Sequence, residues 1–172
     1  MKTFLSSLFG KLSRCWYFVR YSDKLPYWQA GNARLFMITL RKDKADDVGL
    51  LEHEKFHVKQ WWFGFLLLSA IGWPLMCFAS DQVLMMVGAV VSGCAPACHA
   101  LLYYFVRPYR QWSEVKAYRI QLARGGYGDK RFAVLALMHP KYKLKITKFE
   151  AEKLLGLDLN SLLVAATKKD ES

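Results

Sequence analysis

A nearly uncharged stretch in the middle of the chain limits most strongly what this sequence can fold into. Between Trp61 and Val106 the only charged side chain is Asp81. Water-exposed surfaces carry many charged residues, so this stretch is not a soluble surface. It contains two apolar runs, Trp61–Ala79 and Val83–Val106, and each has close to the length, about 20 residues, that a helix needs to cross the hydrocarbon of a bilayer. The sequence therefore predicts a hairpin of two membrane-spanning helices.

Basic residues crowd both outer flanks of this apolar region. Lys and Arg outnumber Asp and Glu by 11 to 6 before residue 61 and by 14 to 7 after residue 106, and the whole chain carries +11. The turn around Asp81 contains no Lys or Arg, so the positive-inside rule places both termini in the cytoplasm. The alternative is a soluble protein with a buried helical hairpin. Glycines and prolines within the runs favour it, although membrane helices tolerate both residues.

Small residues recur along the second apolar run, at Gly88, Ala89, Ser92, Gly93, Ala97 and Cys98. This pattern lets helix backbones approach closely in lipid, and an oligomer could form through the same face. Cys94 and Cys98 lie four residues apart and His99 follows, which suits either a metal or redox pair or small packing residues; we favour packing. The chain has too few cysteines for a disulfide framework, so a reducing compartment is expected.

Local patterns predict further elements outside the hairpin. The expected elements are a strand at Arg34–Arg41, a helix capped by Asp46 or Asp47 that runs into the first apolar run, a helix at Trp112–Leu122 ended by glycines, and a short helix at Thr147–Leu155 opened by a capping box. The apolar residues between Phe4 and Val19 are spaced by three and four. They predict a basic amphipathic helix on the membrane surface, with an ordinary core-facing helix as the alternative.

The segment His53-Glu54-Lys55-Phe56-His57 has the pattern H-E-x-x-H. Two histidines four residues apart project from one face of a helix, which suits two imidazole ligands on one zinc ion. The glutamate between them can take a proton from water bound to the metal. The alternative is an amphipathic helix that exposes His and Glu to solvent.

A catalytic zinc ion needs a third protein ligand. Asp81 is excluded because the hairpin turn lies on the far side of the membrane. Glu114 follows directly after the second apolar run returns to the cytoplasmic side, so an antiparallel hairpin brings it back beside His57. We therefore expect His53, His57 and Glu114 to hold Zn²⁺.

The residues from His53 to Tyr118 resemble the gluzincin metalloproteases. Within them they are most similar to the integral-membrane family of CAAX prenyl proteases and heat-shock membrane proteases, where H-E-x-x-H is followed by membrane spans and then by E-x-x-A-D. Here Glu114 and Ala117 match that second motif, and Tyr118 stands in the Asp position. The motif helix also looks like that of small uncharacterised H-E-x-x-H proteins of bacteria and phages. The resemblance implies zinc peptidase activity.

The predicted fold class is α+β and mostly helical, with the two-span hairpin inserted in a small zincin-like cytoplasmic domain that has a short β-sheet. The chain is expected to form one composite domain from residues 1–60, which carry the motif helix, residues 61–106, which form the hairpin, and residues 107–172, which supply the third ligand. The protein is then a multi-pass membrane protein whose active site faces the cytoplasm, and its expected partners are a peptide or protein substrate and membrane lipids.

The expected reaction is peptide hydrolysis by water bound to zinc, with Glu54 as the base that accepts the proton and later passes it to the leaving amine. The strand at Arg34–Arg41 would offer an edge to an extended peptide. Tyr118 or His139 would stabilise the oxyanion, and the spacing does not choose between them.

Two other functions are compatible with the sequence. One is a non-catalytic, basic, two-span membrane protein, holin-like or an assembly factor, whose charged ends bind anionic lipid. The other is a nucleic-acid binder that uses the basic C-terminal block, although the alternation in Lys141–Ile146 is more simply a strand with one basic face. We expect no nucleic acid, because membrane topology already explains the basic flanks.

Overall fold

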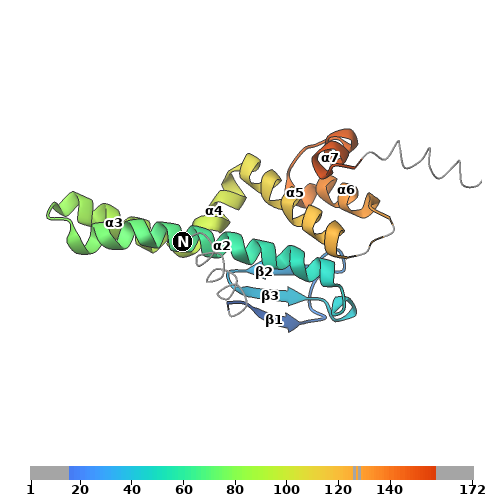
Figure 1. Ribbon diagram of the computed structural model, residues 1–172, viewed down its shortest axis with the longest axis horizontal. Coiled ribbons are helices and arrows are strands. Elements are labelled where there is room, and N and C mark those ends of the chain that lie inside the picture. The colour runs from blue at the N-terminus through green and yellow to red at the C-terminus, as the bar shows by residue number, and fades with distance from the viewer. Residues whose placement is uncertain (1–15, 126, 128, 158–172) are drawn as a thin grey trace, which may run out of the picture.

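The computed structural model describes residues 16–125, 127 and 129–157 (Figure 1). Most of the predicted N-terminal amphipathic helix lies outside these residues. Its expected end at Val19 is wrong, because Val19 lies in strand β1 (Phe18–Tyr21). The fold is mostly helical, with one small sheet and two long apolar helices, as the sequence predicts.

The sheet has three strands of four residues each, β1, β2 (Gly31–Arg34) and β3 (Met37–Leu40), in the order β1-β3-β2. β3 runs parallel to β1 and antiparallel to β2. The single strand predicted at Arg34–Arg41 is therefore wrong at its start. Arg34 ends β2, and Leu35, with a φ of 56°, turns the chain before β3 begins.

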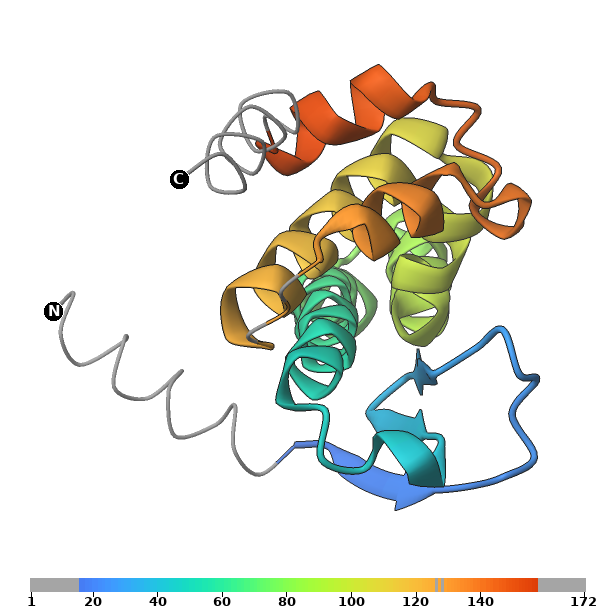
Figure 2. The same cartoon turned by 90° about the vertical axis from the view of Figure 1, so that its right-hand side faces the viewer.

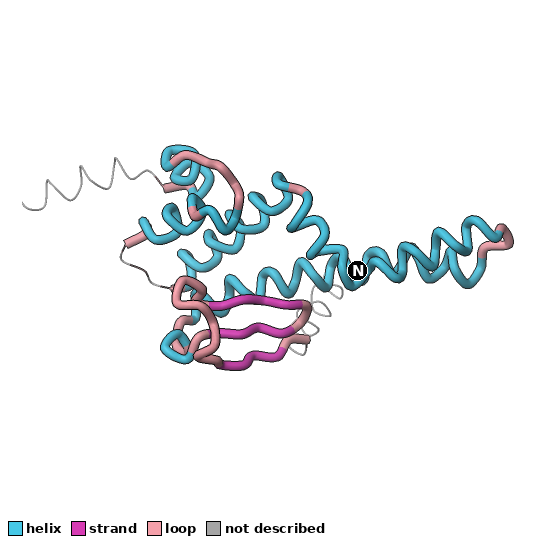
Figure 3. The backbone as a smooth tube through the Cα atoms, turned by 180° about the vertical axis from the view of Figure 1, so that it is seen from behind, coloured by secondary structure: helices cyan, strands magenta, loops and turns pink. Residues whose placement is uncertain are grey.

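The order of the strands also corrects the expected peptide-binding edge. β3 pairs on both sides and so has no free edge for a substrate. Within the part of the chain that the structure describes, β2 pairs only with β3. β2 is thus the edge strand next to the long helix α2 (Figure 3).

Helix α2 (Val48–Phe78) continues from the motif segment into the first apolar run without a break. Asp47 caps it, as predicted, by accepting a hydrogen bond from the Leu50 N–H at 2.8 Å. Its first half packs on the sheet, where Leu50 and Val58 join Ile38 and Leu40 in a small apolar core. This packing fixes the motif segment between the sheet and the other helices.

The second apolar segment returns as α3 (Gln82–Cys94), the short 3₁₀ turn η2 (Ala95–Ala97) and α4 (Cys98–Phe105). The Trp61 indole N–H donates to the Pro96 carbonyl at 2.7 Å, which satisfies a backbone group at this interruption. The two apolar helical segments, Val48–Phe78 and Gln82–Phe105, are long and apolar enough to cross a membrane. In an apolar stretch of 18 residues within each segment, only 11% of the stretch is buried.

The small residues let the two arms of the hairpin touch. A Cβ atom at Gly72 would lie 2.7 Å from the Ser92 backbone nitrogen and 2.8 Å from the Gly88 carbonyl oxygen. A Cβ atom at Gly88 would lie 2.4 Å from the Met76 backbone nitrogen and 2.8 Å from the Leu75 carbonyl carbon. These members of the small-residue pattern thus pack within one chain, and an oligomer through the same face stays a prediction.

Three helices complete the fold, α5 (Arg107–Arg124), α6 (Arg131–Met138) and α7 (Lys148–Leu155). α5 extends the predicted helix at both ends, and the Thr147–Glu150 capping box is confirmed. The expected strand at Lys141–Ile146 is wrong: η3 (Pro140–Tyr142) begins there, and Lys143 and Lys145 adopt positive φ values of 51°. Buried Leu144 joins a second apolar core between α5, α6 and α7.

Viewed along the hairpin, α5 lies between α2 and the pair α6 and α7, and the sheet lies on the other side of α2 (Figure 2). Glu114 of α5 lies against His53 and His57 of α2, and Gly31 of β2 lies against Glu54.

Candidate metal centre

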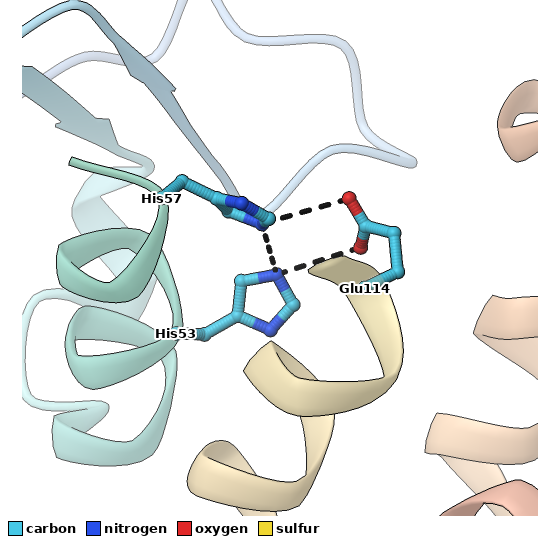
Figure 4. A group of neighbouring side chains, drawn as sticks. All are labelled: His53, His57 and Glu114. Atoms are coloured by element: carbon cyan, nitrogen blue, oxygen red, sulfur yellow. Dashed lines mark hydrogen bonds and ion pairs between the residues drawn. The ribbon is translucent and has the colours of Figure 1, made fainter. Parts of the chain in front are cut away.

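Two helices bring the three expected ligands together. His53 and His57 project from one face of α2, and Glu114 projects toward them from α5 (Figure 4). The two Nε2 atoms lie 3.3 Å apart. His53 Nε2 lies 3.7 Å from Glu114 Oε2, and His57 Nε2 lies 3.5 Å from Glu114 Oε1. The structure thus confirms a His53, His57 and Glu114 group that could hold a metal ion.

Zn–N and Zn–O bonds of about 2.0 to 2.2 Å place neighbouring ligand atoms of a tetrahedral site about 3.3 to 3.6 Å apart. The two Nε2 atoms have this separation, and one ligand atom from each of the three residues lies within 4.8 Å of the others. His53 and Glu114 are buried, and Glu114 Oε2 has no hydrogen-bond partner among the described residues. A buried carboxylate oxygen without a donor is costly, and a cation at this point would satisfy it. The residues therefore fit a dication.

Hydrogen bonding at Nδ1 of His57 orients the ring so that its Nε2 points toward Glu114. His57 Nδ1–H donates to Gln60 Oε1 at 3.1 Å, and the Ser113 hydroxyl donates to the same oxygen at 2.7 Å. With Nδ1 protonated, Nε2 carries the lone pair that binds metal. Gln60 lies one turn along α2, and Ser113 precedes the ligand Glu114 on α5. The two helices that supply the ligands thus also orient one of them.

A residue of the second apolar segment positions the Glu114 carboxylate. The Tyr103 hydroxyl of α4 donates to Glu114 Oε1 at 2.5 Å. Arg110 is buried and donates to the carbonyls of Tyr103 and Tyr104, at 2.8 and 2.9 Å, which ties α5 to the end of α4. The second apolar segment therefore contributes directly to the site.

The environment of His53 keeps it neutral. Burial and, to a smaller extent, the charge of His57 lower the pKa of His53 well below its usual value. A neutral imidazole is the form that binds a metal ion. The Tyr118 ring packs edge-on against His53, with ring centroids 4.6 Å apart. Tyr118 thus lies against a ligand in the position where the resembled family has Asp.

Glu54 is buried on the adjacent face of α2, against the edge strand β2. Burial, together with the nearby charge of Glu114, raises the pKa of Glu54 to about 8, while Lys141 and the Ala33 backbone oppose the rise. A carboxyl with a pKa near neutrality is suited to exchange protons at physiological pH. Glu54 thus lies next to both the His53, His57 and Glu114 group and the sheet edge.

The structure places the two residues that were expected to stabilise the oxyanion, Tyr118 and His139, in different surroundings. The Tyr118 hydroxyl lies 2.9 Å from the Tyr142 hydroxyl, close to His53. His139 is exposed, accepts from the Lys141 N–H at 3.2 Å and stacks on Trp28, with ring centroids 6.4 Å apart. The proximity of Tyr118 to a ligand makes it the better placed of the two. Whether either acts in a reaction stays a prediction.

Sequence reasoning missed several residues near the site. His99, considered only with the cysteines, lies with its ring centroid 6.1 Å from that of His57, and its Nδ1 pairs with the Tyr109 hydroxyl at 2.8 Å. Lys141 lies near enough to Glu54 to oppose the rise of its pKa, and burial, only partly offset by the charges of Glu114 and Glu54, lowers the pKa of Lys141 itself. No motif pointed to these residues, since only the bend between α4 and α5 and the turn at η3 bring them here. Cys98 lies close to Gly64, which agrees with a packing role, whereas Cys94 is exposed.

Comparisons with protein-family models, with curated proteins and with solved structures find no match for this chain. The arguments about its function therefore rest on its own residues.

Proposed function

We propose that this protein is a membrane-embedded zinc metallopeptidase related to the gluzincins. The observation that carries the proposal is the convergence of His53, His57 and Glu114 at the spacing of zinc ligands, from two helices far apart in the sequence. The buried position of Glu54 beside them supports a catalytic rather than a purely structural site. Three protein ligands leave a fourth coordination position open to water or substrate, which is typical of catalytic zinc.

The expected chemistry divides between the metal and the chain. A zinc ion bound here would polarise the substrate carbonyl and lower the pKa of water. Glu54 accepts the proton from the attacking water and passes it to the amine of the leaving peptide. His57 is kept in the correct tautomer by Gln60 and Ser113, and Tyr103 fixes the Glu114 carboxylate.

The edge strand β2 supports a peptide as the substrate. Its unpaired side is available within the described chain, and its Ala33 backbone lies close to Glu54. An extended peptide that adds to this edge gains backbone hydrogen bonds and carries its carbonyl groups past Glu54. We therefore propose β2, in place of β3, as the edge that binds a peptide.

The exposed surface of the hairpin supports its insertion into a membrane. Large apolar side chains on both arms are well exposed, among them Phe63 at 70%, Phe78 at 85% and Val90 at 65%. A soluble helical hairpin would bury these side chains, whereas lipid is a favourable solvent for them. We therefore propose that the hairpin spans the bilayer and that the metal centre lies on the cytoplasmic side.

The proposal is tested with Glu54→Gln in the detergent-purified full chain, assayed on unfolded protein substrates with and without chelator. We expect the variant to keep the metal content of the wild type and to lose peptidase activity by about 10² to 10⁴-fold, since it removes the general base. Chelation should abolish the wild-type activity. Equal proteolysis by the wild type and the variant would refute the mechanism. Absence of zinc from the wild type would instead favour the non-catalytic, two-span membrane protein.

A further inference from the structure

The face of α5 that points away from the metal centre forms one wall of a basic pocket of about 480 Å³. α7 lies over α5 and contributes Leu154 to the pocket (Figures 1 and 2). Its lining residues are Arg107, Pro108, Gln111, Trp112, Val115, Lys116, Arg119 and Leu154. We refer to this site as the α5–α7 pocket.

The lining has three positive charges and no negative one. Arg107, Lys116 and Arg119 form no ion pair within 4.0 Å among the described residues. Hydrogen bonds from Thr147 and, to a smaller extent, the charge of Arg107 lower the pKa of Glu150. The Glu150 carboxylate is already engaged, because it accepts hydrogen bonds from the backbone N–H and the hydroxyl of Thr147. The pocket therefore has an uncompensated positive charge that suits an anion.

Arg119 shows that part of the pocket is preformed. Its Nε and Nη2 donate to the Leu154 carbonyl, at 2.9 and 2.5 Å, which fixes the guanidinium between α5 and α7. Arg107 makes a longer contact, 3.5 Å, to the Lys145 carbonyl. Because these contacts are to neutral carbonyls, the guanidinium charges are held in place without being neutralised.

The pocket begins where the second apolar segment ends. Arg107 is the first residue of α5 and follows directly on the exposed apolar residues Phe105 and Val106. Trp112, which is 48% exposed, also lines the pocket. Arginine beside an exposed tryptophan at the end of a membrane span is typical of the headgroup region of a bilayer. The charge and the location thus point to the same class of ligand.

We propose that the α5–α7 pocket binds the phosphate headgroup of an anionic phospholipid, with Arg107 and Lys116 as the recognising residues. This inference uses the proposed membrane hairpin but is independent of metal binding and peptidase activity.

The test compares two doubly substituted forms of the full chain. Arg107→Gln with Lys116→Gln removes two charges from the pocket but keeps Arg119, which holds α7 in place. Lys24→Gln with Lys130→Gln removes two charges from exposed positions outside the pocket lining. Each protein, purified in detergent, is titrated with phosphatidylglycerol or phosphatidylcholine, and bound lipid is measured by native mass spectrometry. Zinc content is measured in the same samples, so that a failure of the metal centre is seen separately.

We expect the wild type to prefer phosphatidylglycerol, the pocket variant to bind it about tenfold or more weakly, and the control variant to bind it within about twofold of the wild type. The expected unchanged zinc content of the pocket variant would show that the fold is intact. Equal losses in both variants, or no preference over phosphatidylcholine, would overturn the proposal. Displacement of the lipid by excess inorganic phosphate would assign the pocket to a free anion and overturn it as well.

Discussion

The two halves of α2 show two ways of stabilising one helix. The first half, with His53 and Gln60, is buried between the sheet and α5, and the Ser113 hydroxyl of α5 donates a hydrogen bond to Gln60 Oε1. The second half is apolar and largely exposed, and it contacts its partner α3 through Gly72 and Gly88. The site half therefore depends on satisfying polar groups, whereas the hairpin half depends on how closely two backbones approach.

The join between the halves lies near Trp61. Its indole donates to the Pro96 carbonyl at the interruption of the second apolar segment, and beyond that interruption α4 brings Tyr103 to Glu114. The hairpin thus also shapes the candidate metal centre, because its residue Tyr103 donates a hydrogen bond to Glu114.

The largest effect is expected for Gly88→Ile in the hairpin half. A branched side chain at Gly88 would collide with the backbone of α2, including the Gly72 carbonyl at 2.8 Å from the Cβ position. We expect a loss of about 3 kcal/mol in the free energy of unfolding, measured by SDS denaturation of the detergent-purified protein. Gly93→Ile is the matched control, since a Cβ atom there meets nothing within 4 Å. Similar losses in both variants would contradict the packing of the hairpin.

A smaller effect is expected for Gln60→Ala in the site half. The substitution removes the acceptor that orients His57 and leaves the Ser113 hydroxyl without this partner. We expect zinc affinity to fall by about 10 to 100-fold, measured by competition with a chelator of known affinity. Gln82→Ala, at an exposed position near the hairpin turn, should leave the affinity unchanged. An unaltered affinity in Gln60→Ala would show that His57 needs no such support.

The smallest effects compare the caps of the two long helices. Asp47 accepts from the Leu50 N–H and from the Tyr127 hydroxyl, whereas exposed Asp81 accepts only from the Leu84 N–H among the described residues. We expect Asp81→Ala to cost about 1 kcal/mol and Asp47→Ala about 2 kcal/mol in the free energy of unfolding. The corresponding Asn variants should retain most of the stability. The reverse order of the two Ala variants would contradict the assigned roles of the caps.

Long patterns in the sequence predicted the structure better than short ones. The absence of charge over many residues predicted the two apolar helices, because burying or inserting charges is costly at every position. The position of Glu114 followed from topology, since an antiparallel hairpin brings the chain back to the end of the helix from which it started, beside His57. Both arguments depend on many residues at once, and the structure confirms the helices and the cluster of three ligands.

Short elements were harder to predict because packing decides them. The sequence Gly31–Arg34 has no strand-forming pattern, yet it pairs with β3, and two intervening residues form the turn. The alternation at Lys141–Ile146 resembles a strand, but Leu144 is buried in the core of α5, α6 and α7 and the flanking lysines adopt positive φ values. Tyr103 belongs to no motif, and the interruption at η2 and the helix α4 that follows it bring its hydroxyl to Glu114.

The most direct test of the metal centre is elemental analysis of the detergent-purified full chain. Wild-type protein is compared with His57→Ala and with His139→Ala, which removes an exposed histidine outside the group of ligands. We expect about one zinc ion per chain in the wild type and in His139→Ala, and almost none in His57→Ala, because two remaining ligands bind zinc weakly. Zinc that is absent from the wild type after supplementation, or equally present in His57→Ala, would contradict the metal centre.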